Sequence, residues 1–307
     1  MVQTKFDRYD VVVIGQGYAG LTAARIAIEQ GFKTANIEAG SMGGLIVSIN
    51  ELDPVPEGLE RSGAELASGL AISNMDKGVV TVYGTVMAVK RGEDDLWLVQ
   101  TESETLVAPH VVVASGARLR KLGIPGEKEF FGQGVSECAD CDGPMFRGME
   151  TVVVGGGDSG FQEAQALAEF ARKVTIVMRG KAPRARAELV ERAAANPKIV
   201  QLMNTQVLAI EGTPGKGVER IRLETEGESE RILPTAGVFV FIGLEPNTGF
   251  LPTGLNRDEA GALVTSNQCA TPLPGLWAIG AVRSGYQGML TDAAADAERA
   301  LAALALS

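Results

Sequence analysis

The sequence predicts an α/β protein in which one βαβ unit with a glycine-rich turn occurs twice. The first copy begins at YDVVVIGQGYAG (9–20) and the second at TVVVGGGDSG (151–160). In each copy a short apolar run of buried-strand length leads into glycines spaced GxGxxG and then into a helix-forming stretch. Strand-rich segments follow both copies. We therefore expect two Rossmann-like domains, each with a small antiparallel β layer.

The first unit carries the pattern of a dinucleotide site. A strand is predicted over 11–14, a helix over 21–31, and a second strand that ends on Glu38. The turn glycines are Gly15, Gly17 and Gly20. Glycines let the backbone approach a pyrophosphate, the helix N-terminus stabilises its charge, and an acidic side chain accepts from a ribose hydroxyl. A GxGxxG motif alone is weak evidence, but strand, helix and terminal acid all stand in register here.

The second unit repeats this order. A strand over 152–154 precedes the turn, a helix over 161–171 follows it, and a strand over 174–178 ends near Arg179. Its turn glycines are Gly155, Gly157 and Gly160. Two dinucleotide folds in one chain indicate a flavin and a second dinucleotide that exchange electrons.

The intervening segments predict β layers on both units. Three follow the first unit, at 79–90, 95–103 and 106–116, and three follow the second, at 199–212, 218–227 and 237–243. They alternate between apolar and polar residues or run apolar, as strands do. The alanine-rich tail at 291–307 predicts a helix, with Asp292 or Thr291 as its N-cap.

Composition excludes several classes of function. The 307 residues contain 28 Lys and Arg against 38 Asp and Glu, a net charge of −10. That balance disfavours nucleic-acid partners and anionic membranes, which need cationic surfaces. No apolar run reaches the ~18 residues of a membrane span, and the first residues lack the apolar core of a signal peptide. We expect a cytoplasmic protein.

A cysteine pair stands in SECADCDG (136–143). Zinc needs four ligands, and beyond the pair the chain offers only Cys269 and His110, so no metal site is predicted. Stable disulfides are rare in the cytoplasm, where CxxC pairs are usually redox or metal sites. A silent, reduced pair is the alternative to a redox pair.

With these motifs in order, the chain resembles the low-molecular-weight thioredoxin reductases over nearly its whole length. The motifs that carry the resemblance are the first GxGxxG with Glu38, ASGA (114–117), CADCDG (138–143), GGGDSG (155–160), FIGLEPNT (241–248) and TPLPGLWAIG (271–280). The resemblance implies an FAD-binding domain in two pieces, 1–119 and 249–307. A nucleotide domain over 120–248, which carries the CxxC, is inserted between them.

The resemblance also implies roles for the cysteine motif. Cys141 is the flavin-facing thiol, Cys138 exchanges with the substrate disulfide, and Asp142 is the acid/base for the leaving thiolate. A carboxyl beside a thiol is suited to moving that proton. A carboxylate that merely caps the loop is the alternative for Asp142. Cys269 has no redox role in the family and is expected to be a buried, inert thiol.

For the flavin, the resemblance implies a set of contact positions: Gly15, Gly17, Gly20, Glu38, Gly43, Gly44, Ala114, Ser115, Gly116, Gly280, Ala281 and Gln287. Several of the family's polar flavin contacts are changed. Ala281 replaces an Asp, Leu45 a Gln and Pro54 an Asn, while Tyr286-Gln287 stands for Arg-Gln. FAD is still expected, because the pyrophosphate and adenosine machinery is intact, but in an altered environment.

For the second nucleotide, the matching positions are Gly155, Gly157, Asp158, Ser159, Arg179 and Arg184. The family clamps the 2′-phosphate of NADPH with a His-Arg-Arg run and a further Arg, but here Met178 and Gly180 replace the His and one Arg. Each lost charge-assisted contact is worth roughly 1.5–3 kcal/mol. Weak or no NADPH use is predicted; compensation by Lys181, Arg184 and Arg186 is the alternative.

The function predicted is that of an FAD-dependent disulfide oxidoreductase of the thioredoxin reductase type. Its partner would be a thioredoxin-like protein or a small disulfide or dithiol, and its donor ferredoxin or a second flavin nucleotide in the NADPH-type cleft. The alternatives are a conventional NADPH-dependent thioredoxin reductase, a dithiol oxidase, and a structural dinucleotide-binding protein. The family implies a homodimer, for which the tail helix at 293–306 could supply an interface.

Overall fold

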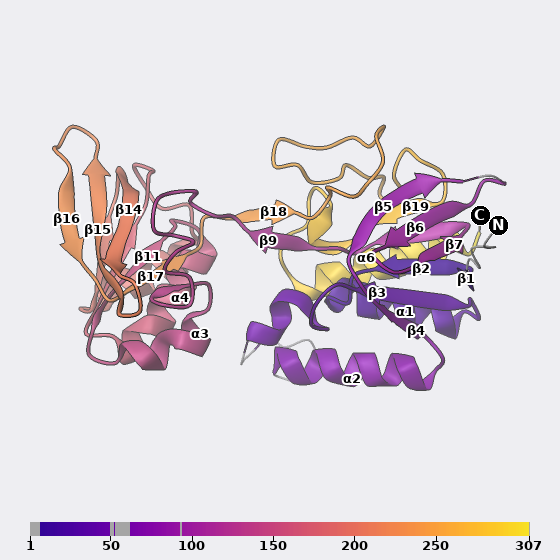
Figure 1. Cartoon of the computed structure of the whole chain (residues 1–307), viewed down its shortest axis with the longest axis horizontal. Helices are drawn as coiled ribbons and strands as arrows, with labels where there is room; N and C mark the ends of the chain where they lie inside the picture. The colour runs from indigo at the N-terminus through magenta and orange to yellow at the C-terminus, as the bar shows by residue number, and fades with distance from the viewer. Residues whose placement is uncertain (1–6, 50–51, 53–61, 93, 307) are drawn as a thin grey trace. The chain divides into compact units, whose positions relative to one another are not determined.

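The computed structural model describes residues 7–49, 52, 62–92 and 94–306. The replacement at Pro54 lies outside these residues. The chain divides into two compact units, one formed by Met1–Arg118 with Glu245–Ser307 and the other by Leu119–Leu244 (Figure 1). Each unit contains a parallel sheet and a smaller β layer, which confirms the predicted fold class.

The first unit is built on a five-stranded parallel sheet with the order β19-β8-β2-β3-β4. Its strands are β2 (Val11–Ile14), β3 (Thr34–Glu38), β4 (Val80–Tyr83), β8 (His110–Val113) and β19 (Leu276–Ala278). Its helices are α1 (Tyr18–Glu29), α2 (Gly63–Asp76) and α6 (Leu290–Leu304). All four residues of β2 are buried, as a central parallel strand with both faces covered requires.

A four-stranded layer completes this unit. Its order is β1-β7-β6-β5, with β1 (Asp7–Arg8), β5 (Val86–Arg91), β6 (Trp97–Thr101) and β7 (Thr105–Ala108). The predicted strand segments 79–90 and 106–116 are wrong as single elements, because each divides between the two sheets. Gly84, at φ 156°, separates β4 from β5. Pro109, which has no N–H for a ladder, separates β7 from β8.

The second unit repeats the plan. Its parallel sheet has the order β10-β17-β11-β12-β13, with β10 (Val135–Ser136), β11 (Glu150–Val154), β12 (Lys173–Val177), β13 (Ile199–Leu202) and β17 (Gly237–Val240). Its antiparallel layer contains β14 (Thr205–Thr213), β15 (Gly217–Thr225) and β16 (Arg231–Pro234). Its helices are α3 (Ala139–Asp142), α4 (Asp158–Phe170) and α5 (Ala187–Ala195), with the 3-10 turn η2 (Gly143–Phe146). The segment 199–212 therefore also contributes to both sheets, with Asn204 at φ 49° between them.

Two crossing segments connect the units. They contain β9 (Ala117–Leu119) and β18 (Leu244–Pro246), which pair with each other. Further on, Asn247 is tied to the ASGA segment: Ser115 Oγ donates to its carbonyl oxygen at 2.7 Å, and Asn247 Nδ2 donates to the Ser115 carbonyl at 2.9 Å.

The tail helix departs from its predicted start. α6 begins at Leu290, so Thr291 and Asp292 lie inside its first turn and the predicted cap is wrong. Met289 occupies the N-cap position and forms no side-chain cap. The apolar face of α6 packs against α1 within its own unit, with Ala297, Ala300 and Leu301 fully buried.

No helix in the described part of the chain combines the length and the apolar character needed to cross a membrane.

Candidate active site

The glycines of the first turn have two different roles. A Cβ at Gly15 would stand 2.4 Å from the Ala114 carbonyl oxygen, and one at Gly20 would stand 2.0 Å from the Gly15 carbonyl oxygen. These two glycines therefore permit close packing of the turn, β8 and α1. Gly17 faces open space and is the N-cap of α1, with no side chain capping the helix. The first amides of α1 are thus available to an anionic group.

Glu38 lies at the carboxyl end of β3, beside this turn. Its Oε2 accepts from the Gln16 amide at 2.7 Å and its Oε1 from the Gly40 amide at 2.9 Å. These bonds fix the carboxylate at the strand end and leave it lone pairs for a ribose hydroxyl. Gln16 is 2% exposed, and its Nε2 donates to the carbonyl of Asn36 in β3 at 3.3 Å. This bond ties the turn to the sheet.

A second glycine pair is brought against the same turn. The Gly43 amide donates to the Gln16 carbonyl at 2.7 Å, and a Cβ at Gly44 would lie 3.3 Å from the Gly17 Cα. Both adopt positive φ, at 101° and 58°. Next to them begins η1 (Gly44–Ser48), on which Leu45 is 48% exposed. An apolar side chain therefore stands in solvent where the family has a Gln.

The Gly280-Ala281 segment follows β19 and forms the short 3-10 turn η3 (Gly280–Val282). Asp296 of α6, which is fully buried, accepts from the Gly280 amide at 3.0 Å and from Arg283 at 2.5 and 2.7 Å. Burial raises the pKa of Asp296, but the bonds from Arg283 and Gly280 outweigh it and hold the pKa below its usual value. The turn is thus fixed from behind by Asp296, while Ala281 offers no polar group in front.

Two predicted positions before α6 differ in environment. Gln287 is exposed, whereas Tyr286 is partly buried and its hydroxyl donates to the Met289 carbonyl at 3.1 Å. Burial, helped by Asp292 and Asp296, raises the pKa of Tyr286 to about 12. Tyr286 therefore stays neutral over the physiological range.

The second turn reproduces the first in the other unit. A Cβ at Gly155 would lie 2.1 Å from the Phe241 carbonyl oxygen and one at Gly160 would lie 2.5 Å from the Gly155 carbonyl oxygen. Gly157 faces open space and is the uncapped N-cap of α4. Asp158 accepts from the Arg186 amide and Nε, both at 2.8 Å, while Ser159 is exposed. The first amides of α4 are therefore also available to an anionic group.

The two positions at which the sequence predicts a lost phosphate clamp, Met178 and Gly180, carry no charge. Met178 is 4% exposed, and its side chain packs beneath Gly156 as part of the core. Gly180 is exposed and brings no charge. Arg179 lines a hollow of about 330 Å³ together with Glu224, Glu226 and Glu228. Three carboxylates beside one guanidinium oppose a dianionic phosphate.

Two further cations lie near the turn. The Arg184 amide donates to the Gly156 carbonyl at 2.7 Å, which holds exposed Arg184 next to the glycines. Arg186 is already paired, with Asp158 at 2.8 Å and with Glu188 at 3.0 Å. Arg184 is therefore better placed than Arg186 to contact a phosphate at this turn, because the Arg186 side chain already forms two ion pairs.

Cys138 and Cys141 form a disulfide with a Cα–Cα distance of 5.4 Å. Cys138 is the N-cap of α3, and its Sγ accepts from the Cys141 amide at 3.1 Å. Cys141 is exposed and Cys138 partly buried. A sulfur at a helix N-cap is placed to be stabilised as a thiolate. Asp142, the last residue of α3, is partly buried.

One residue near this pair was not predicted from the sequence. Glu163 of α4 accepts from the Ala139 amide, directly after Cys138, at 2.8 Å. Burial, opposed by this bond and reinforced by Asp140, raises the pKa of Glu163 to about 7. No sequence signal separates it from an ordinary helical glutamate, because the contact joins residues 24 apart.

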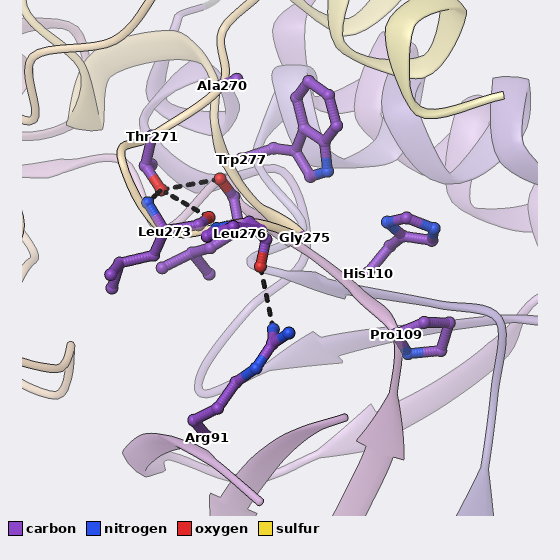
Figure 2. A pocket seen from close by; sticks show the side chains of 10 residues that line it. Arg91, Pro109, His110, Ala270, Thr271, Leu273, Gly275, Leu276 and Trp277 are labelled. Atoms are coloured by element: carbon purple, nitrogen blue, oxygen red, sulfur yellow. Dashed lines mark hydrogen bonds between the residues drawn. The ribbon is translucent and has the colours of Figure 1, made fainter. Parts of the chain in front are cut away.

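A hollow in the first unit lies away from these residues. It measures about 370 Å³ and is lined by Trp277, His110, Arg91 and the 270–276 loop (Figure 2). It adjoins the amino ends of β8 and β19, whereas open α/β sheets bind ligands at the carboxyl ends. Burial lowers the pKa of His110, which is neutral at pH 7. We assign this hollow no part in the site.

Cys269 is the remaining cysteine. It is 1% exposed and burial raises its pKa, so the predicted buried thiol is confirmed.

Comparison with known proteins places this geometry in a family. The family model "Pyridine nucleotide-disulphide oxidoreductase" matches residues 9–298. The chain is 39% identical over 290 residues to the thioredoxin reductase of Listeria innocua, covering 94% of this chain and 90% of that protein. It is 36% identical over 289 residues to that of Bacillus subtilis, covering 94% and 91%.

Solved structures agree. The thioredoxin reductase of Lactococcus lactis superposes with a TM-score of 0.90 at 33% identity, covering 97% of this chain and 98% of that one. The enzyme of T. acidophilum gives 0.88 at 31% identity, covering 98% and 99%. The chain belongs to the pyridine nucleotide-disulphide oxidoreductases and, within them, to the low-molecular-weight thioredoxin reductase family of flavoprotein disulfide oxidoreductases.

Proposed function

We propose that this enzyme moves electrons between FAD and a partner disulfide through Cys138 and Cys141, with weak or no use of NADPH. The observation that carries the proposal is the disulfide at the N-cap of α3, in a chain with two uncapped glycine-turn helices. The unit containing Leu119–Leu244 is proposed to be the nucleotide domain, and the unit containing both termini the FAD domain.

The residues of the first unit fit FAD. Gly17 leaves space for a pyrophosphate at the free amides of α1, and Glu38 stands at the adenosine-ribose position. The other proposed contacts come from Gly43, Gly44, Ala114, Ser115, Gly116, Gly280 and Gln287. FMN has no pyrophosphate or adenosine, so these groups favour FAD. Bound FAD would supply a carrier for the two electrons of the dithiol.

The thiol chemistry follows from the turn. We assign Cys138, as a thiolate, the attack on a partner disulfide, which forms a mixed disulfide and releases one partner sulfur. Asp142 gives that sulfur its proton. Cys141 then attacks Cys138, which closes the intramolecular disulfide and releases the second partner sulfur, and the proton that the Cys141 thiol loses goes to that sulfur. Because the relatives are thioredoxin reductases, we propose a thioredoxin-like protein as partner, with a small disulfide as the alternative.

The donor proposal rests on charge. Met178 lies in the core, Gly180 is uncharged, and Arg179 shares its hollow with three glutamates. Recognition of the 2′-phosphate of NADPH takes several converging cations. We therefore infer that ferredoxin, or a second flavin nucleotide held at α4, replaces NADPH as the source of electrons.

Anaerobic stopped-flow measurement of the flavin band tests this proposal. We expect slow or absent bleaching with micromolar NADPH and rapid bleaching with dithionite-reduced ferredoxin or with a dithiol. Bleaching by NADPH at ordinary turnover rates would contradict the proposal and indicate a conventional NADPH-dependent thioredoxin reductase. Fast reduction by dithiol with reoxidation by oxygen indicates a dithiol oxidase, and no reduction by any donor indicates a structural nucleotide-binding protein.

A variant sharpens the donor test. Gly180 has ordinary backbone angles, and a Cβ there would lie 3.1 Å from the Ala182 carbonyl oxygen, so Gly180→Arg needs only a small adjustment. One restored charge-assisted contact should increase NADPH affinity about ten- to a hundredfold. Met149→Arg, before the amino end of β11, adds the same charge at a 45% exposed site of this unit and serves as the control. Equal responses of the two variants would contradict a lost clamp.

The family also implies a homodimer. Because the apolar face of α6 packs within its own unit, the dimer is proposed on family membership alone. Light scattering at micromolar protein that gives the mass of one chain contradicts it.

A further inference from the structure

The N-terminal turn of α3 is shared by two anionic groups once the disulfide is reduced. Cys138 Sγ accepts the Cys141 amide at 3.1 Å, and Glu163 Oε2 accepts the Ala139 amide at 2.8 Å. Ala139, whose amide donates the second of these bonds, is fully buried. A thiolate at Cys138 and a carboxylate at Glu163 therefore draw on amides two residues apart in one short turn, and each disfavours the charge of the other.

The charged side chains on the elements packed against α4, which carries Glu163, are mostly acidic. The elements packed on α4 are α3, α5, η2, β11, β12 and β13. Their charged side chains are Asp140, Asp142, Glu150, Lys173, Glu188, Glu191 and Arg192. Of these, Asp140 contributes to the raised pKa of Glu163, because its charge favours the protonated carboxyl. Among the described residues no Lys or Arg forms an ion pair with Glu163.

We propose that Glu163 is a positioning residue that anchors the disulfide turn through Ala139 and links reduction of the pair to uptake of a proton. The inference rests on the redox activity of Cys138 and Cys141. Two electrons from a dithiol donor break the S–S bond. One of the donor's two protons goes to Cys141. The other goes to Glu163 where Glu163 is ionised before reduction, and to solvent where Glu163 is already protonated. Cys138 remains a thiolate, and the donor becomes a disulfide.

As a consequence, the equilibrium between the disulfide and the dithiol of Cys138 and Cys141 depends on the charge of Glu163. In acid, Glu163 is neutral and does not oppose the thiolate. Above its pKa, near 7, the carboxylate opposes it, so the disulfide resists reduction more. Glu163→Gln keeps an oxygen acceptor for the Ala139 amide and removes the charge. Glu163→Ala removes both.

The test equilibrates the full-length protein as purified with glutathione redox buffers from pH 5.5 to 8.5, and counts free Cys138 and Cys141 by alkylation and mass spectrometry. At pH 8, Glu163→Gln should shift the equilibrium toward the dithiol about three- to tenfold, and at pH 5.5 it should match the unsubstituted protein. Glu169→Gln, an exposed glutamate of the same helix, should match at both pH values. Glu163→Ala should differ also at pH 5.5, because the anchor is lost.

Each outcome is decisive. A pair that never exchanges with glutathione contradicts the redox function itself. A pair that exchanges, with Glu163→Gln equal to the unsubstituted protein at every pH, overturns the role of Glu163 alone. If Gln at 163 prevents folding, the pH profile of the alkylation rate of the reduced, unsubstituted protein still decides. Two titration steps, from thiol and carboxyl, support the proposal, and a single step contradicts it.

Discussion

Asp296 is a buried charged residue in the alanine-rich tail helix, and it connects that helix to the η3 turn. It is fully buried and accepts from Arg283, Arg299 and the Gly280 amide. Asp296→Ala would leave the largely buried Arg283 guanidinium without its carboxylate, which typically costs about 3–5 kcal/mol. We expect a loss of this size in urea unfolding, accompanied by loss of flavin, because η3 loses its support.

Glu298→Ala is the matched control for Asp296→Ala. Glu298 lies two positions further along the same helix and is exposed, so its removal should change the free energy of unfolding by less than about 0.5 kcal/mol. Similar losses in the two variants would show that helix propensity, rather than the buried ion pair, sets the cost.

Glu163 should make stability depend on pH in an unusual direction. Its pKa is raised from 4.5 to about 7, so between these values the native state binds more protons than the unfolded state and stability falls as pH rises. The full effect is about 3 kcal/mol. Glu163→Gln should lose this component, so unfolding free energies of variant and unsubstituted protein should converge near pH 4.5 and separate by pH 8. Parallel curves would contradict the raised pKa.

The predictability of single residues depended on how local their partners are. Cys138, Cys141 and Glu38 were found because spacing along the chain carries their signal. Glu163, Asp296 and Asn247 were missed as site residues, since their partners lie 24, 13 and 132 residues away. The sequence predicts that Met178 replaces a clamp residue, but only the structure shows that Met178 is part of the core.

At the scale of elements, helix glycines divide into those that permit contact and those that do not. A Cβ at Gly20 in α1 would stand 2.0 Å from the Gly15 carbonyl oxygen, whereas one at exposed Gly69 in α2 meets nothing within 4 Å. Gly69→Ala should therefore stabilise the protein by about 0.5–1 kcal/mol through helix propensity. Gly20→Ala should destabilise it and displace α1 from the turn.

The readouts for this pair are thermal unfolding and retained flavin. We expect a higher midpoint with unchanged flavin for Gly69→Ala, and a lower midpoint with flavin lost for Gly20→Ala. Flavin retained in full by Gly20→Ala would contradict the proposed role of this turn.

Elements were predicted well where hydrophobic period and turn chemistry coincide. The run 11–14 formed a buried strand, and both glycine turns preceded helices as expected. The predictions for segments 79–90 and 106–116 were wrong, because each segment contributes strands to two different sheets. The spacing of apolar residues does not show where one strand ends and the next begins. The cap at Thr291 or Asp292 failed because the N-cap position is Met289, two or three residues earlier.

At the scale of the whole molecule, the chain's aromatic residues are distributed unevenly between its units. Both tryptophans, Trp97 and Trp277, and all four tyrosines, at 9, 18, 83 and 286, lie in the unit that contains the termini. Tryptophan fluorescence therefore reports the unfolding of that unit alone, while far-UV circular dichroism reports both units. A transition seen by dichroism but not by fluorescence therefore belongs to the Leu119–Leu244 unit.

This separation gives a test of which nucleotide binds where. A ligand present at about 100 times its Kd stabilises the unit that binds it by about 2.7 kcal/mol, or roughly 5–10 °C for a unit of this size. After flavin removal, added FAD should raise the fluorescence midpoint by that amount. NADPH should leave both midpoints unchanged, because Met178 and Gly180 deprive the second turn of two clamp positions. A rise in the dichroism midpoint with NADPH, while fluorescence stays constant, would locate NADPH in the Leu119–Leu244 unit and refute the donor proposal. A fluorescence midpoint that FAD does not move would refute the assignment of the flavin to the first turn.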